Sequence, residues 1–237
     1  MRNSSAKGLL SSLVFVAMGC ASSAHAAPAA FSERGAFDAA VAGLANVSIA
    51  TLDFDGLTKG DLIASGDTLG GITFTYNFGG VSLQVTSGAD TTSPSNYLGT
   101  DDAGMLQDGD DIHLGFAARN AVGLYVLSID PLIDDDFRLS VGGYSASLAA
   151  ASPLRILDDG TSVYFLGIVD AAATFTSASL TTSHDGETGF YLWNADDMVT
   201  AVAQVPEPET WAMLLAGLGL VGLRTTSRTR RRHSGRP

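Results

Sequence analysis

Short segments of alternating apolar and polar residues, separated by turn residues, constrain the fold of this chain more than any other feature. Residues 72–76 (ITFTY) and 81–85 (VSLQV) show the pattern clearly. Side chains that alternate with a period of two belong to strands with one buried face. The glycines in 77–80 and at Gly142 and Gly143 predict a hairpin between 72–76 and 81–85, and a second between 137–141 and 144–148.

Further strands are expected at intervals of about ten residues, with no helical pattern between them. They cover 47–54, 112–116, 122–129, 163–169, 175–182, 190–193 and 198–202. This order predicts an all-β fold, an antiparallel two-sheet β-sandwich of jelly-roll type. No repeat of fixed period is visible, which argues against a solenoid or a propeller.

One short amphipathic helix is expected ahead of the strands. Phe37, Val41 and Leu44 recur at the spacing of one helix face, and Ser32 is the expected N-cap. A single hydrophobic helix is expected at the other end of the chain, over 211–223.

Residues 1–26 have the three parts of a signal peptide. Arg2 and Lys7 precede a mostly apolar run over 8–18, and Ala24-His25-Ala26 fits the small-x-small cleavage rule, so cleavage is expected after Ala26. The run is shorter than the roughly 20 apolar residues of a membrane span. Lipoprotein processing at Cys20 is an alternative, disfavoured by Ala17 at the position three before it. Cleavage after Ala26 removes the only cysteine, and with it any disulfide or thiolate site.

Residues 205–237 also divide into three parts. A proline-punctuated motif over 205–210 precedes the apolar segment from Trp211 to Leu223, and a basic tail occupies 224–237. Thirteen helical residues reach only about 20 Å, less than the roughly 30 Å of a bilayer core, which favours a transient anchor. The arginines suit the cytoplasmic face. They include Arg224, Arg228, Arg230, Arg231 and Arg232.

Val205-Pro206-Glu207-Pro208, followed by an apolar segment and an arginine-rich end, resembles the PEP-CTERM sorting signal of Gram-negative bacteria that make exopolysaccharide. The resemblance implies that an exosortase, a membrane transpeptidase-like protease, recognises Pro206, Glu207 and Pro208 and removes the tail. With signal peptidase as first partner, the protein would cross the inner membrane, be anchored there transiently and reach the cell surface or the medium. An ordinary C-terminal anchor is the alternative.

Charge is segregated along the chain. The net charge of −12 divides into +2 for 1–26, −18 for the body over 27–204 and +4 for 205–237. The body holds 23 acidic residues against five basic ones, which excludes nucleic acid as a partner. Such a body repels acidic polymers at low salt, so a divalent ion is a candidate bridge.

The body's carboxylates occur in clusters that suggest calcium, which takes six to eight oxygen ligands. No cluster matches a known calcium loop, and solvated turns are the alternative. Asp53 or Asp55 with Asp196 or Asp197 is the first pair to consider, because first and last strands often adjoin in sandwiches. The candidate ligands are Asp53, Asp55, Asp108, Asp110, Asp196 and Asp197.

The body also resembles the carbohydrate-binding-module-like sandwiches that are often joined to this sorting signal, through the segments 51–55, 71–74, 93–98 and 189–198. The resemblance implies a non-enzymatic protein of the extracellular matrix or cell envelope, acting in adhesion or in association with exopolysaccharide. Stacking on sugars would use Tyr97, Tyr144, Tyr191 or Trp193, although the alternating residues around Trp193 favour a core position for it. A secreted glycan hydrolase with paired Asp carboxylates is the alternative.

Overall fold

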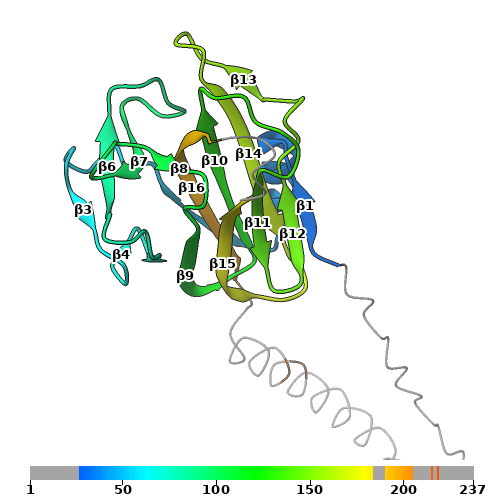
Figure 1. Cartoon of the computed structure of the whole chain (residues 1–237). Coiled ribbons are helices and arrows are strands. Elements are labelled where there is room, and N and C mark those ends of the chain that lie inside the picture. The colour runs from blue at the N-terminus through cyan, green and yellow to red at the C-terminus, as the bar shows by residue number, and fades with distance from the viewer. Residues whose placement is uncertain (1–26, 184–189, 205–214, 216–217, 219–237) are drawn as a thin grey trace, which may run out of the picture.

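The computed structural model describes residues 27–183 and 190–204, together with residues 215 and 218. Within them, two antiparallel β-sheets face each other and one short helix lies outside them (Figure 1). The predicted all-β sandwich with a short N-terminal helix is therefore confirmed. The signal peptide over 1–26, the motif over 205–210, the basic tail over 224–237 and, apart from residues 215 and 218, the apolar segment over 211–223 lie outside the described residues.

The larger sheet is built around β16, its longest strand. Its order is β1 (Ala29–Phe31), β14 (Ser162–Val169), β10 (Ala121–Ser128), β16 (Leu192–Ala203), β7 (Asn96–Thr100), β6 (Leu83–Ser87) and β3 (Leu62–Ile63). Three further strands pair beside this path. They are β13 (Arg155–Ile156) on β14, and β2 (Val47–Leu52) and β8 (Leu106–Gln107) on β16.

The smaller sheet covers one face of the larger one. Its order is β12 (Tyr144–Ser147), β11 (Phe137–Val141), β15 (Phe175–Thr182), β9 (Ile112–Arg119), β5 (Ile72–Thr75) and β4 (Thr68–Leu69). Apolar side chains from both sheets form the main core. Trp193 lies at its centre, fully buried, with Phe137 edge-on at 5.0 Å and its indole nitrogen donating to the Gln107 carbonyl at 3.0 Å.

The two predicted hairpins have opposite outcomes. The hairpin at Gly142 and Gly143 is confirmed, because β11 and β12 pair with Val141 opposite Tyr144. The hairpin between 72–76 and 81–85 is wrong, since β5 pairs with β9 in the smaller sheet and β6 with β7 in the larger one. Residues 76–82 thus cross between the sheets, and each strand takes its hydrogen bonds from a partner in its own layer.

β16 joins the segments 190–193 and 198–202, which were predicted as separate strands, into one strand from Leu192 to Ala203. The pairing with β10 shifts between Gly123 and Tyr125, and Asp197 has a φ of 47°. This irregularity is a β-bulge, which inserts a residue and redirects the side chains beside it. The polar residues Asn194, Asp196 and Asp197 made the middle of this strand resemble a loop.

Helix α1 (Arg34–Ala42) lies on the outer face of the larger sheet, where Phe37 and Val41 are buried as their spacing predicts. The predicted cap at Ser32 is wrong, because Glu33 is the N-cap residue and makes no side-chain capping bond. Nowhere in residues 27–183 and 190–204 is there a helix with the length and apolar character needed to cross a bilayer.

Phe37 occupies a hollow in the sheet made by two glycines. Gly123 in β10 and Gly167 in β14 lie opposite each other in the strand register. A Cβ atom on Gly167 would lie 2.6 Å from the Phe37 ring and 2.8 Å from the Phe165 ring. The helix can approach the sheet this closely only because both positions lack a side chain.

Gly167→Ala is therefore expected to lower the free energy of unfolding by about 2 kcal/mol, because overpacking forces Phe37 and Phe165 apart. Gly143→Ala is the matched control, since a Cβ there meets nothing within 4 Å. Urea unfolding of the purified protein measures both. Equal stability of Gly167→Ala and the wild type would show that α1 does not depend on this contact.

Candidate functional site

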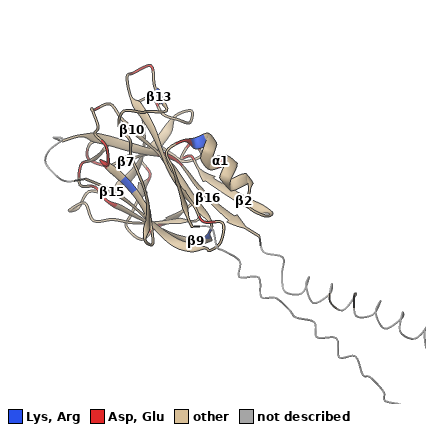
Figure 2. Ribbon diagram, turned by 90° about the vertical axis from the view of Figure 1, so that its right-hand side faces the viewer, with Lys and Arg blue, Asp and Glu red and all other residues tan. Residues whose placement is uncertain are grey.

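The carboxylates of the body lie mainly in loops. Among the described acidic residues, only Asp38 in α1 and Asp196 and Asp197 in β16 are inside a helix or strand (Figure 2). Many of the others accept hydrogen bonds from backbone N–H groups of turns. Asp170 Oδ1, for example, accepts from the amides of Ala172 and Ala173, both at 2.9 Å. These carboxylates fix the shape of the loops that carry them.

Asp196 is the exception because it is fully buried within a strand. Its Oδ2 accepts from the hydroxyls of Thr91 and Thr92, at 2.5 and 2.7 Å, and from the Ser93 amide at 3.1 Å. Its Oδ1 accepts from the Asp197 amide at 2.8 Å. This one carboxylate therefore holds the loop between β6 and β7 over the middle of β16.

Three further carboxylates help to hold the same loop. Asp55 Oδ1 accepts from the amides of Ser95 and Asn96, at 3.0 and 2.9 Å. Asp90 and Asp159 exchange hydrogen bonds, each amide donating to Oδ2 of the other residue at 3.1 Å. The β6–β7 loop is thereby joined to the loop that follows β13.

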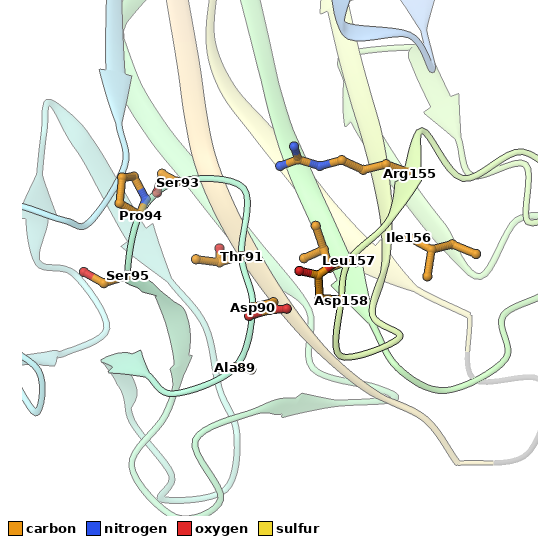
Figure 3. Close-up of a pocket in the computed structure, with 10 residues that line it drawn as sticks. All are labelled: Ala89, Asp90, Thr91, Ser93, Pro94, Ser95, Arg155, Ile156, Leu157 and Asp158. Carbon is orange, nitrogen blue, oxygen red and sulfur yellow. The ribbon is translucent and has the colours of Figure 1, made fainter.

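A cleft of about 480 Å³ lies between these two loops (Figure 3). Thr91, Ser93 and Ser95 line it from the β6–β7 loop, and Arg155 and Asp158 line it from the β13 side. Its walls carry hydroxyls, carboxylates and one guanidinium. The Thr91 and Ser93 hydroxyls already donate to Asp196, so a ligand rich in hydroxyl groups would find its donor in the guanidinium and its acceptors in the carboxylates.

Arg155 is exposed, and its guanidinium points across the cleft toward the β6–β7 loop (Figure 3). Its Nη2 donates to the Thr92 carbonyl at 3.4 Å. In the described part of the chain, ion pairs join only Arg34 to Asp38 and Arg138 to Asp135. Arg155 therefore keeps most of its five N–H donors for a ligand in the cleft.

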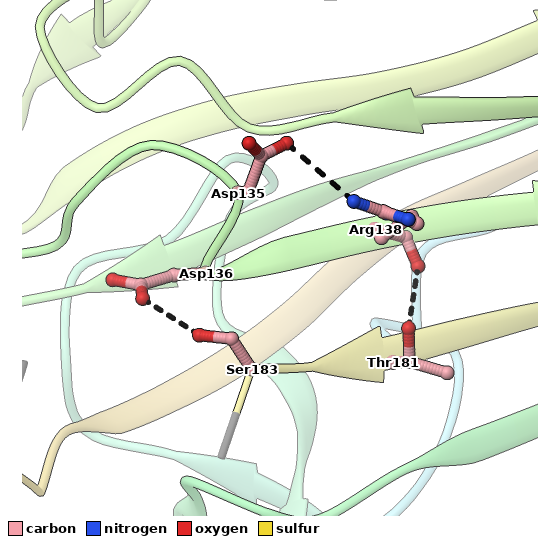
Figure 4. A network of polar contacts seen from close by, with 5 residues as sticks. All are labelled: Asp135, Asp136, Arg138, Thr181 and Ser183. Carbon is pink, nitrogen blue, oxygen red and sulfur yellow. Dashed lines mark hydrogen bonds and ion pairs between the residues drawn. The ribbon is translucent and has the colours of Figure 1, made fainter. Parts of the chain in front are cut away.

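A second network of carboxylate and hydroxyl groups lies at the end of the smaller sheet (Figure 4). Asp136 is fully buried, and its Oδ1 accepts from the Ser183 hydroxyl at 2.9 Å. Its Oδ2 accepts from the Ile133 amide at 2.6 Å. The hydroxyl of the buried Tyr191 donates to the Asp136 carbonyl at 3.2 Å, and burial, followed by the nearby Asp136 charge, raises the pKa of Tyr191. The arrangement joins the ends of β11, β15 and β16.

The expected pairing of first and last strands is confirmed for β2 and β16, where Leu52 lies opposite Met198. It brings Asp53 close to Asp196, and the Ser93 hydroxyl contacts both, at 3.3 Å to the Asp53 carbonyl and 3.2 Å to Asp196 Oδ2. Asp108 and Asp110 are on a separate loop after β8, where Asp110 Oδ2 accepts from the Gln107 amide at 2.9 Å. The six candidate ligands thus form two groups.

Calcium binding stays a prediction. Among the described residues, no three His, Cys, Asp or Glu side chains converge as a metal site. Protein donors already occupy Asp196, Asp55 and Asp110. In the structure, these predicted calcium ligands accept hydrogen bonds from N–H and O–H groups of the protein.

Three of the four aromatic residues predicted to stack on sugars are in the core. Tyr97, Tyr191 and Trp193 are 5 %, 1 % and 0 % exposed, whereas Tyr144 is 49 % exposed. Trp193 lies on the inner face of β16, Tyr191 is buried just before that strand begins, and Tyr97 lies in β7, where every residue is buried. Sequence reasoning missed Arg155 and the cleft. The sequence feature that could have indicated the cleft was the run of hydroxyl-bearing residues over 91–95.

Asp196→Asn tests the buried carboxylate through the pH dependence of stability. Burial raises the pKa of Asp196, so the folded protein binds this proton more tightly than the unfolded chain does. The contribution of Asp196 to stability therefore grows as the pH falls from neutral toward about 4, and it is lost as the pH rises through the folded pKa. We expect the free energy of unfolding of Asp196→Asn to change less between about pH 5 and 7 than that of the wild type.

Urea unfolding at a series of pH values measures this difference. Gly143→Ala, which changes no titratable group, is the control and should keep the wild-type slope. If Asp196→Asn also keeps that slope, the Asp196 carboxylate does not carry the pH dependence.

Comparison with known proteins identifies the C-terminal segment. Residues 204–232 match the family model described as the PEP-CTERM protein-sorting motif. No curated protein matches the chain. Among solved structures, the K2 cleaved adhesin domain of Lys-gingipain is similar over 65 % of this chain and 97 % of its own, at 10 % identity and a TM-score of 0.42. The predicted sorting motif is thereby confirmed, and it implies export, processing by an exosortase and sorting to the cell surface.

Proposed function

We propose that this protein is displayed at the cell surface or in the extracellular matrix, where its acidic sandwich associates with exopolysaccharide without catalysing a reaction. The sorting motif carries the proposal. Its match begins at residue 204, directly after β16 ends at Ala203. The folded body thus ends where the sorting segment begins, so removal of the tail would leave the sandwich intact.

The cleft supports polysaccharide as the ligand class. Its carboxylates and guanidinium suit a ligand with many hydroxyl groups, and its open position between two loops suits a polymer that continues beyond the site. The net charge of −18 on the body disfavours an acidic polymer unless a cation lies between them. In this proposal, calcium is the cation that bridges the acidic body and an acidic polysaccharide.

A glycan hydrolase is the second candidate. Asp90 and Asp158 both line the cleft, and two facing carboxylates are the catalytic requirement of glycosidases (Figure 3). Asp90 Oδ2 already accepts from the Asp159 amide, which favours a structural role for this carboxylate. Release of reducing ends from a polysaccharide by the purified protein, lost in Asp90→Asn with Asp158→Asn, would favour the hydrolase.

Replacement of Pro206, Glu207 and Pro208 by alanine is expected to abolish removal of the tail, because the processing enzyme would no longer recognise its motif. The intact mass of the exported protein then includes residues up to Pro237. Glu209→Ala is the matched control and should be processed like the wild type. Unchanged C-terminal processing of the triple variant would refute exosortase sorting through this motif.

Arg155→Ala is expected to weaken polysaccharide binding about tenfold, because a hydrogen bond from a charged donor contributes about 1.5–3 kcal/mol. Retention of the purified protein on immobilised dextran, mannan, alginate and the exopolysaccharide of the producing cell measures binding, with calcium and with EDTA. Arg138→Ala is the control, since Arg138 lies on β11 and pairs with Asp135. If the wild type binds none of these polymers, the proposed association is wrong.

A further inference from the structure

A second, smaller pocket lies at the segment that crosses between the two sheets. Its volume is about 230 Å³, and it is formed by residues 64–65 after β3 and by residues 76–82 between β5 and β6. Tyr76 and Phe78 line it together with Ser65, Asn77 and Ser82. It lies at the opposite end of β6 from the cleft, because the cleft begins at Ala89 beyond Ser87.

Tyr76 is held in one position by hydrogen bonds at both ends of the residue. Its hydroxyl donates to the Ile63 carbonyl at 2.5 Å and accepts from the Leu83 amide at 3.0 Å. Its own amide donates to the Ser65 hydroxyl at 3.0 Å, and that hydroxyl donates to the Tyr76 carbonyl at 2.9 Å. The ring is therefore fixed before any ligand arrives, so ordering it costs no entropy on binding.

Phe78 stacks on this fixed ring. The two ring centroids are 4.6 Å apart and the ring planes differ by 27°. Gly79 and Gly80, at φ values of 67° and 111°, turn the chain back immediately afterwards, with Val81 bridged to Phe78. Both rings are half-buried, so the stacked pair keeps part of its surface in the pocket.

We propose that the pocket binds one neutral sugar ring of an extracellular polysaccharide, with the C–H face of the sugar against the Phe78 ring, which Tyr76 supports by stacking on it. This inference rests on the proposed function and names the chemistry that a second site would recognise. Aromatic rings offer a flat apolar surface that suits the C–H face of a pyranose, and the Asn77 amide can bond its hydroxyls.

The size and charge of the pocket support a single neutral ring. Its volume is below the roughly 300–1,000 Å³ typical of sites for drug-sized ligands. None of its lining residues is charged, and the nearby Asp101 carboxylate, which accepts from the Ser82 amide at 3.0 Å, disfavours an acidic sugar. The cleft differs in this respect, because Arg155 and two Asp residues line it.

Retention of the purified protein on dextran and mannan, which are neutral, and on alginate, which is acidic, tests the inference. Phe78→Ala is expected to weaken binding to a neutral polymer at least fivefold, and Phe78→Tyr to preserve it because the ring remains. Phe190→Ala is the matched control, since Phe190 is 66 % exposed and does not line the pocket. It should bind like the wild type.

A fluorescent variant keeps the test valid if Phe78→Ala fails to fold. Phe78→Trp retains a ring and places an indole in the pocket, so its emission should shift when dextran or mannan is added, while wild-type emission should not. Binding of the wild type to a neutral polymer with no effect of Phe78→Ala and no shift in Phe78→Trp would overturn the pocket but leave the proposed function intact. Binding to alginate alone would do the same. Binding to no polymer would overturn both.

Discussion

Hydrogen bonds from backbone amides to aspartate carboxylates hold the loops of this protein in place, and both candidate sites are made of loops. The body has 23 acidic and only five basic side chains, so ion pairs cannot neutralise it. The carboxylates instead accept hydrogen bonds from backbone N–H groups in turns, which lack other acceptors. A charged acceptor makes a stronger hydrogen bond than a neutral one. Asp55 and Asp196 show the effect most clearly, because together they fix the whole β6–β7 loop.

The strands of the sandwich hold the ends of these loops in fixed positions. β16 passes through the middle of the larger sheet, and its bulge at Asp197 places Asp196 under the β6–β7 loop. The crossing between sheets at 76–82 places Tyr76 and Phe78 at the other end of β6. The two ends of β6 therefore carry two different surfaces, a charged, hydroxyl-rich cleft and an uncharged aromatic pocket. A polymer with many similar units is the kind of ligand that could use both.

Local patterns predicted the strands well and their partners less well. Alternation identified most strands of both sheets, and a two-glycine link predicted β11 and β12 as a hairpin. The predicted hairpin between β5 and β6 was wrong, because the same alternation suits a strand of either sheet. Only the packing of the core decides which sheet a strand joins. β7 is not among the predicted strands, because the serines and proline just before it are turn residues and conceal a buried strand. Tyr191 was a candidate for sugar stacking because alternation shows two faces but not which one is covered, whereas for Trp193 alternation favoured the core position that it takes.

The sequence by itself determined the fold class, the segregation of charge and the sorting motif at 204–232. The sorting motif is one contiguous segment, so its identification does not depend on contacts with the rest of the chain. The tertiary structure alone decided what the carboxylates do. Asp196 lies more than a hundred residues from Thr91, and Tyr76 meets Ile63 and Leu83 only because the chain crosses between sheets there. Contacts between residues so far apart depend on how the strands pack, and packing depends on the whole core rather than on any local pattern.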